Sequence, residues 1–558
     1  MTTLTLNPAM PLHGDVTRVD ATWVGLVEAS DLASSPDRVT LETGALYDRA
    51  RLLVRDHGAV RGYVTLPVEA GTVDPDRLQR AVDELPPSLH AARPAPRLIS
   101  VVVCTRDRAT LLRESLTALA ALDYPLVEVI VVDNAPTSTE TRDLLADEFG
   151  DFRYVREDAP GLSHARNAGL RAASAGIVAF TDDDVIVDPQ WLWAISTGFA
   201  RSDDIGCVSG VVPTGELRND VQAYFDARVS WSKLTAQRVF RLSDPPEDLP
   251  MFPFCVGEFG TGANFAVRRD RMLALGGFDT ALGAGTRTKG GEDLDMFLRV
   301  LYSGEAIAVE PAALVWHRHR DDLEALRAQA IGYGRGFGAW AAVVALDPRM
   351  LGTALRRSPR AIGRLVNKPM STVDDTSGTS RTLSAEARQV GRLELKSILG
   401  GPASYFAERR VQRDAGTLAG PPERGRALER RCWASLAAAG GLFGLLALLP
   451  LGTGVSFLFL SVFVLVGPGA LVRAWVPLPA HLSPVVVPAL GLSTVLLLTT
   501  GLVFAQWWNP PLTLAVMAIV TCVVAAVSFR VGFSGALPRR GARRTASGRR
   551  DSRVRSLA

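Results

Sequence analysis

Three adjacent aspartates, Asp182, Asp183 and Asp184, directly follow an apolar stretch, 177–181, that has the composition of a buried strand. Three carboxylates in such a place repel one another, which is costly unless a cation joins them. In an extended chain Asp182 and Asp184 point the same way, which suits one hard divalent cation, Mn²⁺ or Mg²⁺. Such an ion commonly bridges the oxygens of a diphosphate and stabilises it as a leaving group. The alternative is a solvated acidic turn, and the position after a buried strand favours the metal site.

A second acidic cluster, Glu292-Asp293, follows two glycines and begins a predicted helix that runs to about residue 302. The helix dipole at its N-terminus favours the ionised carboxylate. A carboxylate held beside a sugar hydroxyl can act as a general base. The alternative is ordinary acidic capping, with Asp295 and Arg299 as a surface pair four residues apart, and the cluster alone favours capping.

A third cluster, His317-Arg318-His319-Arg320, ends another apolar stretch. An imidazole there can complete the metal shell of the aspartates, and the arginines can face phosphates. A histidine pair in such a place is more often structural or simply exposed. No GxGxxG follows the first predicted strand and no GxxxxGK[ST] occurs, so dinucleotide and P-loop sites are disfavoured.

A strand–helix alternation that begins near residue 98 must position these groups. Continuous apolar stretches predict buried strands, and helical periodicity predicts the helices between them. The expected strands are 98–104, 127–132, 152–155 and 177–181, and the expected helices are 110–122, 139–149 and 163–174. This order implies an α/β fold with a mostly parallel sheet, whose ligands bind beyond the carboxyl ends of the strands.

The chain divides into five parts. They are a small N-terminal α+β module (1–90), the α/β domain (98–320), a helical and basic membrane-proximal linker (321–431), a transmembrane domain (432–530) and an arginine-rich tail (531–558). In the module we expect strands at 51–55 and 60–67, a helix at 74–85, and a structural or partner-docking role. In the linker we expect helices at 321–346 and 385–413, a flexible loop at 374–380, and a basic segment at 349–368 that we expect on the anionic membrane leaflet.

Between Cys432 and Phe529 the only formally charged residue is Arg473. Four apolar runs, each near the ~20 residues that cross a bilayer core, occupy 433–449, 455–472, 482–505 and 512–529. Arginines flank the first and last runs, and four crossings place both flanks on the cytoplasmic side. Because the first run is short, a topology with two or three crossings is the alternative. Acidic residues interrupt any N-terminal signal peptide, so we expect a multi-pass protein of the cell inner (cytoplasmic) membrane with cytoplasmic catalytic domain and C-terminus.

Charge and cysteine content exclude other classes. The formal net charge is +3, and a polyanion-binding protein usually carries more, so we expect no nucleic acid partner. The five cysteines lie far apart and form no CxxC pair, which fits reduced thiols and argues against a disulfide framework or a zinc site.

In their order along the chain, the motifs resemble those of family 2 glycosyltransferases with the GT-A (Rossmann-like) fold. The matching segments are Ile99–Arg108, Val129–Asn134, Gly161–Gly169, Phe180–Asp184, Gly262–Asn264, Gly276–Asp279, Gly291–Asp293 and the segment around His317. The resemblance covers about residues 98–320. The usual first-strand motif ends Pro-Thr-Tyr-Asn, whereas this chain has Cys104-Thr105-Arg106-Asp107, so an aromatic contact with the base is missing from the motif.

The resemblance implies a role for each matching residue. The nucleotide-sugar would contact Thr105, Asp107, Asp133, Arg166 and Asp183, with Asp133 accepting a hydrogen bond from the base. Asp182 and Asp184 match the DxD motif that holds Mn²⁺ or Mg²⁺, and His317 would be a further ligand. Asp293 matches the base that deprotonates the acceptor hydroxyl, and Glu292 would orient the acceptor or the base. Attack opposite the leaving diphosphate would invert the anomeric centre.

These features predict a membrane-anchored, metal-dependent, inverting glycosyltransferase. Its partners would be a nucleotide-diphospho-sugar donor, a lipid-linked or cell-envelope polysaccharide acceptor, and membrane lipids. The QxxRW motif of processive synthases is absent, which favours the addition of one or few sugars. One alternative is a polyprenyl-phosphate glycosyltransferase, whose phosphate acceptor needs no strong base. Two others are a non-catalytic nucleotide-sugar-binding scaffold and a transporter, the latter disfavoured by the few charges in the apolar runs.

Overall fold

The structure, a computed structural model, describes residues 2–18, 21–88, 92–229, 235–367, 381–476 and 483–531. The predicted loop at 374–380 and nearly all of the tail at 531–558 lie outside these residues. The chain forms two compact units, Met1–Pro421 and Pro422–Ala558, and each is described by itself.

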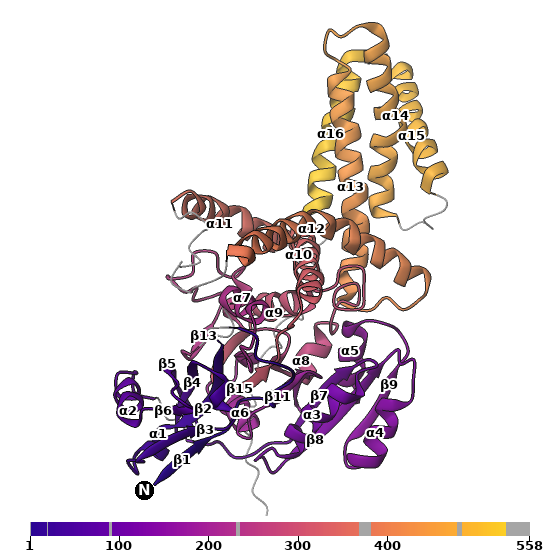
Figure 1. The fold of residues 1–558 in the computed structure, drawn as a ribbon. Coiled ribbons are helices and arrows are strands. Elements are labelled where there is room, and N and C mark those ends of the chain that lie inside the picture. The colour runs from indigo at the N-terminus through magenta and orange to yellow at the C-terminus, as the bar shows by residue number, and fades with distance from the viewer. Residues whose placement is uncertain are drawn as a thin grey trace, which may run out of the picture. The chain divides into compact units, whose positions relative to one another are not determined.

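The first unit is built on a nine-stranded sheet (Figure 1). One half contains the four strands expected from the sequence, in the order β10-β7-β8-β9, with every neighbouring pair parallel. Their bounds are β7 Ile99–Thr105, β8 Val127–Asn134, β9 Arg153–Glu157 and β10 Ile177–Asp182. The connecting helices are α3 Ala109–Ala120, α4 Glu140–Glu148 and α5 Leu162–Ala172. The predicted strand–helix alternation is therefore confirmed.

The other half of the sheet is mixed. Its strands are β11 Val185–Val187, β12 Ile205–Val211, β13 Arg238–Phe240, β14 Asn264–Arg268 and β15 Ala306–His317. β14 runs antiparallel to both β10 and β12, and β15 runs parallel to β12 but antiparallel to β11 and β13. The fold is thus a mixed α/β fold with a GT-A-like central sheet, parallel only in the half that carries the first motifs.

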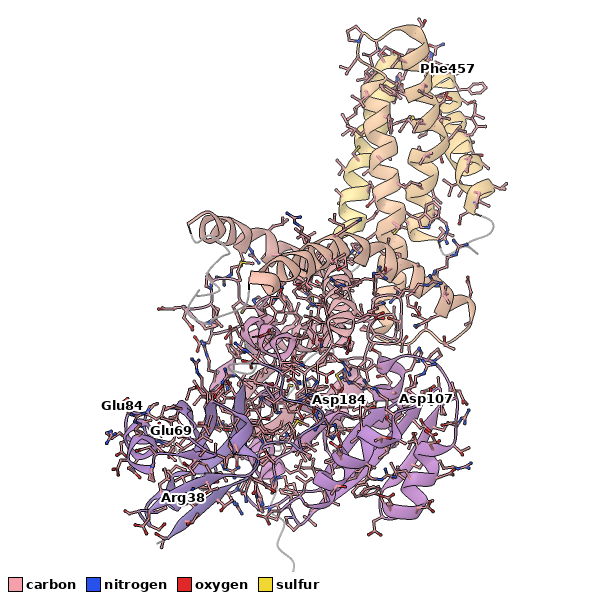
Figure 2. The ribbon with its side chains drawn as sticks, in the orientation of Figure 1. Arg38, Glu69, Glu84, Asp107, Asp184 and Phe457 are labelled. Atoms are coloured by element: carbon pink, nitrogen blue, oxygen red, sulfur yellow. The ribbon has the colours of Figure 1, made fainter. Side chains whose placement is uncertain are left out.

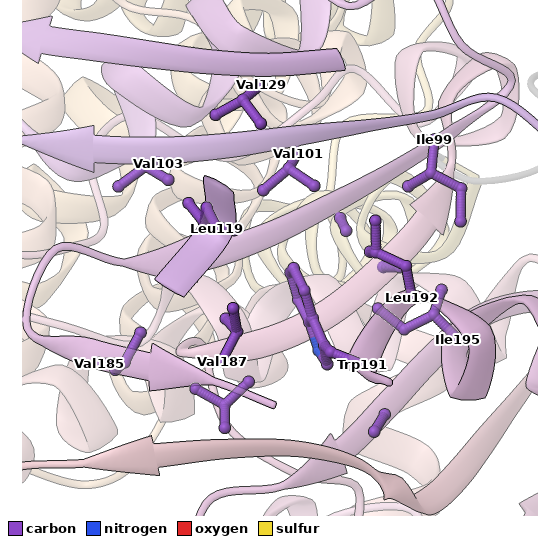
Figure 3. Packing of buried hydrophobic residues seen from close by; sticks show 14 of the residues in the cluster. Ile99, Val101, Val103, Leu119, Val129, Val185, Val187, Trp191, Leu192 and Ile195 are labelled. Carbon is purple, nitrogen blue, oxygen red and sulfur yellow. The ribbon is translucent and has the colours of Figure 1, made fainter. Parts of the chain in front are cut away.

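Both faces of the sheet are covered, which is why its strands are continuously apolar. Alternate residues of β7 enter different clusters: Val101 and Val103 belong to one, and Val102 to the other. Figure 3 shows the first cluster, in which side chains of β7 and β8 meet Leu119 of α3 and Trp191 of α6 (Trp191–Ala200). The Trp191 indole is fully buried and donates its N–H to Asn264 Oδ1 at 2.9 Å.

The N-terminal module contains two three-stranded sheets, β1-β3-β6 and β2-β4-β5. The elements are β1 Thr3–Leu6, β2 Thr22–Glu28, α1 Ala29–Leu32, β3 Arg38–Leu41, β4 Arg49–Asp56, β5 Ala59–Pro67, β6 Thr72–Val73 and α2 Pro75–Asp83. Asp74 caps α2 as expected, because its carboxylate accepts the Arg77 N–H at 2.7 Å.

This module packs against the strand that ends in the histidine motif. Val24 and Leu53 share a buried cluster with Leu314 and with Trp316, the residue immediately before His317. Arg318 then crosses to the same N-terminal segment, where it donates to the Pro11 carbonyl at 2.8 Å. The module is therefore continuous with the α/β domain through the end of β15.

Three long helices complete the first unit: α10 Leu323–Leu346, α11 Pro348–Asn367 and α12 Arg381–Asp414. Glycines on α10 let it approach two neighbours. A Cβ on Gly338 would lie 2.0 Å from the Ile398 carbonyl oxygen of α12, whereas a Cβ on Gly336 would lie 2.7 Å from the backbone carbon of Gly290. The alternating glycines thus allow close backbone packing on two faces of one helix.

The second unit consists of α13 Pro422–Leu446, α14 Thr453–Trp475, α15 Ser483–Phe504 and α16 Pro510–Val531 (Figure 1). Within the described residues, three helices are long and apolar enough to cross a membrane: Thr453–Trp475, Ser483–Phe504 and Pro510–Ser528. α13, which carries the first predicted apolar run, is charged over its first ten residues and falls outside this set. Three of the four predicted spans are therefore supported by length and composition.

α13 nevertheless packs inside the helical bundle. A Cβ on Gly440 would lie 2.6 Å from Gly467 Cα of α14, a close approach typical of small residues between membrane helices. The Arg473 guanidinium near the end of α14 lies 5.5 Å from the Trp433 ring of α13, and Trp475 donates to Ser528 Oγ of α16 at 2.8 Å. The first apolar turn of α13 and the ends of α14 and α16 thus meet at one end of the bundle.

Candidate active site

The predicted site residues gather where the strands of the parallel half end. Thr105 is the last residue of β7, and Asp133 is the last but one of β8. Asp182 is the last residue of β10, and Asp183 and Asp184 follow it directly. Figure 2 labels Asp107 and Asp184, which lie along the same edge of the α/β domain. Asp107 is exposed, adopts a φ of 52° and accepts the Thr137 N–H at 2.8 Å, so it fixes the loop that follows β8.

Asp183 is buried and its two oxygens are already engaged. The Thr105 hydroxyl donates to Asp183 Oδ2 at 2.7 Å, and Arg108 donates to Asp183 Oδ1 at 2.8 Å. Thr105 and Asp183, both predicted to contact the nucleotide-sugar, therefore form an internal pair that holds the end of β7 against the end of β10.

Asp184 faces the histidine motif. Its Oδ1 lies 3.6 Å from His317 Nε2, and its Oδ2 lies 3.4 Å from Arg108 and 3.5 Å from Arg320. On the other side of the imidazole, His317 Nδ1 lies 3.0 Å from Nδ1 of the buried His319. A hydrogen bond between these two nitrogens needs a proton on one of them, so the tautomers of His317 and His319 are coupled.

Arg166 joins the aspartates to the second acidic cluster. Its buried guanidinium lies 3.5 Å from Asp182, donates to Glu292 Oε1 at 2.9 Å and donates to the Gly262 carbonyl at 2.9 Å. Gly262 in turn donates its N–H to Asp293 Oδ2 at 3.0 Å. Asp182, Glu292 and Asp293 therefore belong to one hydrogen-bonded network.

Glu292 and Asp293 begin α9 (Glu292–Tyr302), as expected. Gly291 precedes them with a φ of 92°, which favours glycine, and a Cβ there would lie 2.7 Å from the Gly336 carbonyl oxygen. Asp293 Oδ1 accepts the N–H of Leu294 at 2.8 Å, so backbone donors hold both of its oxygens. The carboxylate is thus fixed in direction at the N-terminus of the helix.

Burial raises the pKa values of Asp182 and Glu292. Burial first, and then the neighbouring aspartates, raise the pKa of Asp182 to about 7, although Arg166 opposes the shift. Burial and the adjacent Asp293 raise the pKa of Glu292. Burial lowers the pKa of His317, so its imidazole is neutral near pH 7 and keeps a lone pair. The negative charge here is incompletely balanced by arginine.

Asp133 presents one oxygen without a partner. Its Oδ2 accepts the Tyr154 hydroxyl at 2.9 Å, whereas Oδ1 is buried and finds no hydrogen bond among the described residues. Burial raises the pKa of this carboxyl group. An unpaired buried oxygen at a strand end is available to accept a donor from a bound base.

The residues fit a divalent cation in part. Asp184 Oδ1 and the neutral His317 face each other across 3.6 Å, a spacing that one ion can bridge, and oxygen and imidazole donors suit Mn²⁺. Asp182 is directed at Arg166 instead. No group of three His, Cys, Asp or Glu side chains positioned to hold an ion occurs in the part of the chain that the structure describes. The three-residue ligand set of Asp182, Asp184 and His317 stays a prediction.

One part of the alternative interpretation of the second cluster, the surface location of a pair, is wrong. Asp295 and Arg299 do pair, at 2.8 Å, but both side chains are buried, at 1% and 8% exposure, rather than lying on the surface. The pair packs α9 into the domain and is therefore part of what holds Asp293 in place.

Sequence reasoning missed three contributors: Arg108, Gly262 and His319. Gly262 and Arg108 lie inside motifs that resemble the family, but their roles depend on strand ends that meet only in the fold. His319 follows His317 by two residues, and this spacing gave a hint that the pair acts together.

A glycine substitution tests the fit between α10 and the acidic cluster. In Gly336→Ala the new methyl would lie 2.7 Å from the Gly290 backbone, so α10 and the loop before Glu292 must separate. If Glu292 and Asp293 have their predicted roles, the reaction rate should fall by about tenfold or more, since small displacements of reacting groups cost that much. The matched control is Gly332→Ala, whose Cβ meets only ordinary contacts at 3.7 Å and should leave the rate unchanged. Equal rates for the two variants would contradict the expectation.

Known proteins resemble this chain over the domain that carries these residues. Residues 100–270 match the family model described as glycosyl transferase family 2. The chain is 28% identical over 242 residues to the pre-mycofactocin glycosyltransferase of Mycobacterium tuberculosis, covering 43% of this chain and 47% of that protein. It is 28% identical over 230 residues to the glucosyl-dolichyl phosphate glucuronosyltransferase of Haloferax volcanii, covering 39% and 69%. It is 33% identical over 226 residues to the succinoglycan biosynthesis protein ExoM of Rhizobium meliloti, covering 39% and 65%.

The match thus spans about half the length of the Mycobacterium relative. Among solved structures, the mannosyltransferase PcManGT from Pyrobaculum calidifontis, in complex with GDP-Man and Mn²⁺, is 17% identical with a TM-score of 0.33, covering 81% of this chain and 92% of that one. The family match at residues 100–270 covers the parallel half of the sheet and the segments quoted for the resemblance. This domain is therefore similar to glycosyl transferase family 2.

Proposed function

We propose that the chain transfers a sugar from a nucleotide-diphospho-sugar to a hydroxyl of a lipid-linked or cell-envelope polysaccharide acceptor, with inversion, at the cytoplasmic face of the membrane. The observation that supports this most is the Arg166 network. It brings Asp182, which the resemblance places at the donor diphosphate, together with Glu292 and Asp293, which it places at the acceptor.

In this proposal the donor binds along the ends of β7, β8 and β10. Asp133 Oδ1 accepts a hydrogen bond from the base, and Arg108 and Arg320 bring positive charge to the place of the diphosphate. Asp184 and His317 would hold Mn²⁺ or Mg²⁺, which supplies charge neutralisation to the departing diphosphate.

Asp293 then acts as the general base. Its carboxylate, oriented by the N–H groups of Gly262 and Leu294, accepts the proton of the acceptor hydroxyl as the oxygen attacks the anomeric carbon. Arg166 keeps Glu292 beside this base and so sets the shape of the acceptor side. The attack comes opposite the diphosphate, which inverts the configuration.

The membrane location in this proposal follows from the second unit. Three helices can span a membrane, and α13 packs among them with its first apolar turn at the same end as the ends of α14 and α16. Arginines lie in the first ten residues of α13 and follow α16 in the sequence, so the positive-inside rule favours a cytoplasmic location for that end.

A donor screen on the full chain in a neutral detergent tests the proposal. With Mn²⁺ present, we expect one nucleotide-sugar of a panel to release its nucleotide, and EDTA to abolish the release. Asp184→Asn should weaken the affinity for Mn²⁺ by about 10- to 100-fold because it removes an anionic ligand. Asp270→Asn, at a 92% exposed side chain, is the control and should behave as the parent chain. Metal-dependent nucleotide binding without sugar release would instead support a non-catalytic scaffold.

A further inference from the structure

A cavity lies away from the aspartates, between α11 and the loop that follows β13. Its volume is about 660 Å³, and its walls include Leu242, Phe252, Tyr302 and the two arginines Arg356 and Arg357. Tyr302 ends α9, whereas Asp293 lies near the start of that helix. Nine residues separate them, which corresponds to about 14 Å along the helix axis. The cavity is therefore distinct from the candidate active site.

The arginines give the cavity a positive rim. Neither Arg356 nor Arg357 forms an ion pair with any carboxylate whose position the structure describes. Among the residues that the structure describes, the Arg356 guanidinium donates to the Gly352 carbonyl at 3.1 Å and to the Thr353 hydroxyl at 3.4 Å, both on its own helix. α11 contains no acidic residue at all. Two adjacent guanidinium groups without counter-charges favour a dianionic ligand such as a phosphate.

Apart from the hydroxyl groups of Tyr302 and Thr353, the rest of the wall is apolar. Leu242, Phe252 and the adjacent Pro253 face the same cavity, so a fully hydrated ion would leave most of the wall without contact. This combination suits a phosphate carried on a hydrocarbon chain, whose head meets the arginines while the chain covers the apolar wall.

The surroundings indicate that such a ligand comes from a membrane. Leu355, next to the two arginines, is 63% exposed, and Leu399 of α12 is 82% exposed. Large aliphatic side chains this exposed on basic helices are typical of segments that lie at a lipid surface. The same chain carries three helices long and apolar enough to span a bilayer.

We propose that the cavity beneath α11 is a binding site for the phosphate head of a membrane lipid, held by Arg356 and Arg357 with the lipid chain along Leu242 and Phe252. The site does not depend on the identity of the sugar donor or on the reaction at Asp293. It fastens the first unit to an individual lipid, in addition to the anchoring given by the helices of the second unit.

The test uses the full chain purified in an uncharged detergent and titrated calorimetrically with farnesyl phosphate, dihexanoyl phosphatidic acid, farnesol and inorganic phosphate. One variant is the double substitution Arg356→Gln/Arg357→Gln. A second, Thr353→Trp, fills the cavity without changing its charge. The matched control is Arg38→Gln/Arg49→Gln, which removes two exposed arginines from the N-terminal module. Nucleotide-sugar turnover without added lipid does not depend on the cavity. It therefore reports whether each variant is folded.

We expect saturable binding of one lipid phosphate per chain, weakened by about tenfold or more in both cavity variants and unchanged in the control. Farnesol and inorganic phosphate should each bind at least about tenfold more weakly, since each lacks one half of the ligand. Binding of inorganic phosphate as tight as that of the lipids would overturn the lipid assignment in favour of a free anion. No saturable binding, or equal loss in the control variant, would overturn the site itself.

Discussion

Replacing Asp293 with asparagine in the full chain should lower the rate of sugar transfer by about 10²- to 10⁴-fold, the usual contribution of a general base. The amide has nearly the same shape, and its oxygen can still accept the Gly262 N–H, now 3.0 Å from Asp293 Oδ2, although its NH2 group cannot replace Oδ1 as acceptor for the Leu294 N–H. What is lost is the ability to take the acceptor's proton. Donor binding, measured by calorimetry with the nucleotide-sugar and Mn²⁺, should stay within about threefold because no contact to the donor is removed.

The same variant separates two kinds of acceptor. A hydroxyl must lose its proton during attack, whereas a lipid phosphate is already ionised and needs no strong base. Asp270→Asn is again the matched control, because it makes the same chemical change on an exposed side chain of α8 (Arg269–Ala274). If Asp293→Asn transfers sugar at the parent rate, the proposed base is wrong and a polyprenyl-phosphate acceptor becomes the better explanation.

Arg166→Met should both destabilise the first unit and abolish activity. The guanidinium is 3% exposed and faces Asp182 and Glu292, so its removal leaves the buried Glu292 and the partly exposed Asp182 without their cation. Breaking a buried pair in this way costs about 3–5 kcal/mol. The loss would appear as a lower melting temperature of the full chain in detergent. Arg171→Met, on the same helix but 59% exposed, should melt with the parent.

A second substitution tests the cause of that loss. Adding Glu292→Gln to Arg166→Met removes one of the stranded charges and should restore part of the melting temperature, although not the activity. If the double variant melts no higher than Arg166→Met, the destabilisation comes from lost packing against Phe265 and Phe278, whose rings lie 5.6 and 5.7 Å from the guanidinium.

The parallel half of the sheet could be predicted because local pattern decides it. Strands buried on both faces read as continuous apolar runs, and the helices between them alternate regularly, so β7, β8 and β10 were found within about two residues. β1 and β3 have four residues each and depend on pairing with distant segments, and the sequence analysis missed them. Short strands of this kind carry too little periodicity to be recognised.

The site followed the same division. The positions of Asp133, Asp182 and Asp293 at strand and helix ends were predictable, because polar residues interrupt apolar runs there. Their partners were not, since the contact between Arg166 and Glu292 joins residues 126 positions apart. The burial of Asp295 and Arg299 was missed for a related reason: the spacing of four residues predicts a pair, but only the packed domain decides whether water reaches it.

The packing of the opening module against Trp316 has a consequence for where the enzyme begins. The first ninety residues pack against the end of β15. The Pro11 carbonyl accepts a hydrogen bond from Arg318, which lies between the two histidines in the sequence. These residues therefore support the end of β15 and help to orient the imidazole of His317 toward Asp184. A fragment that begins at residue 100, where the family match begins, would lack this support for His317.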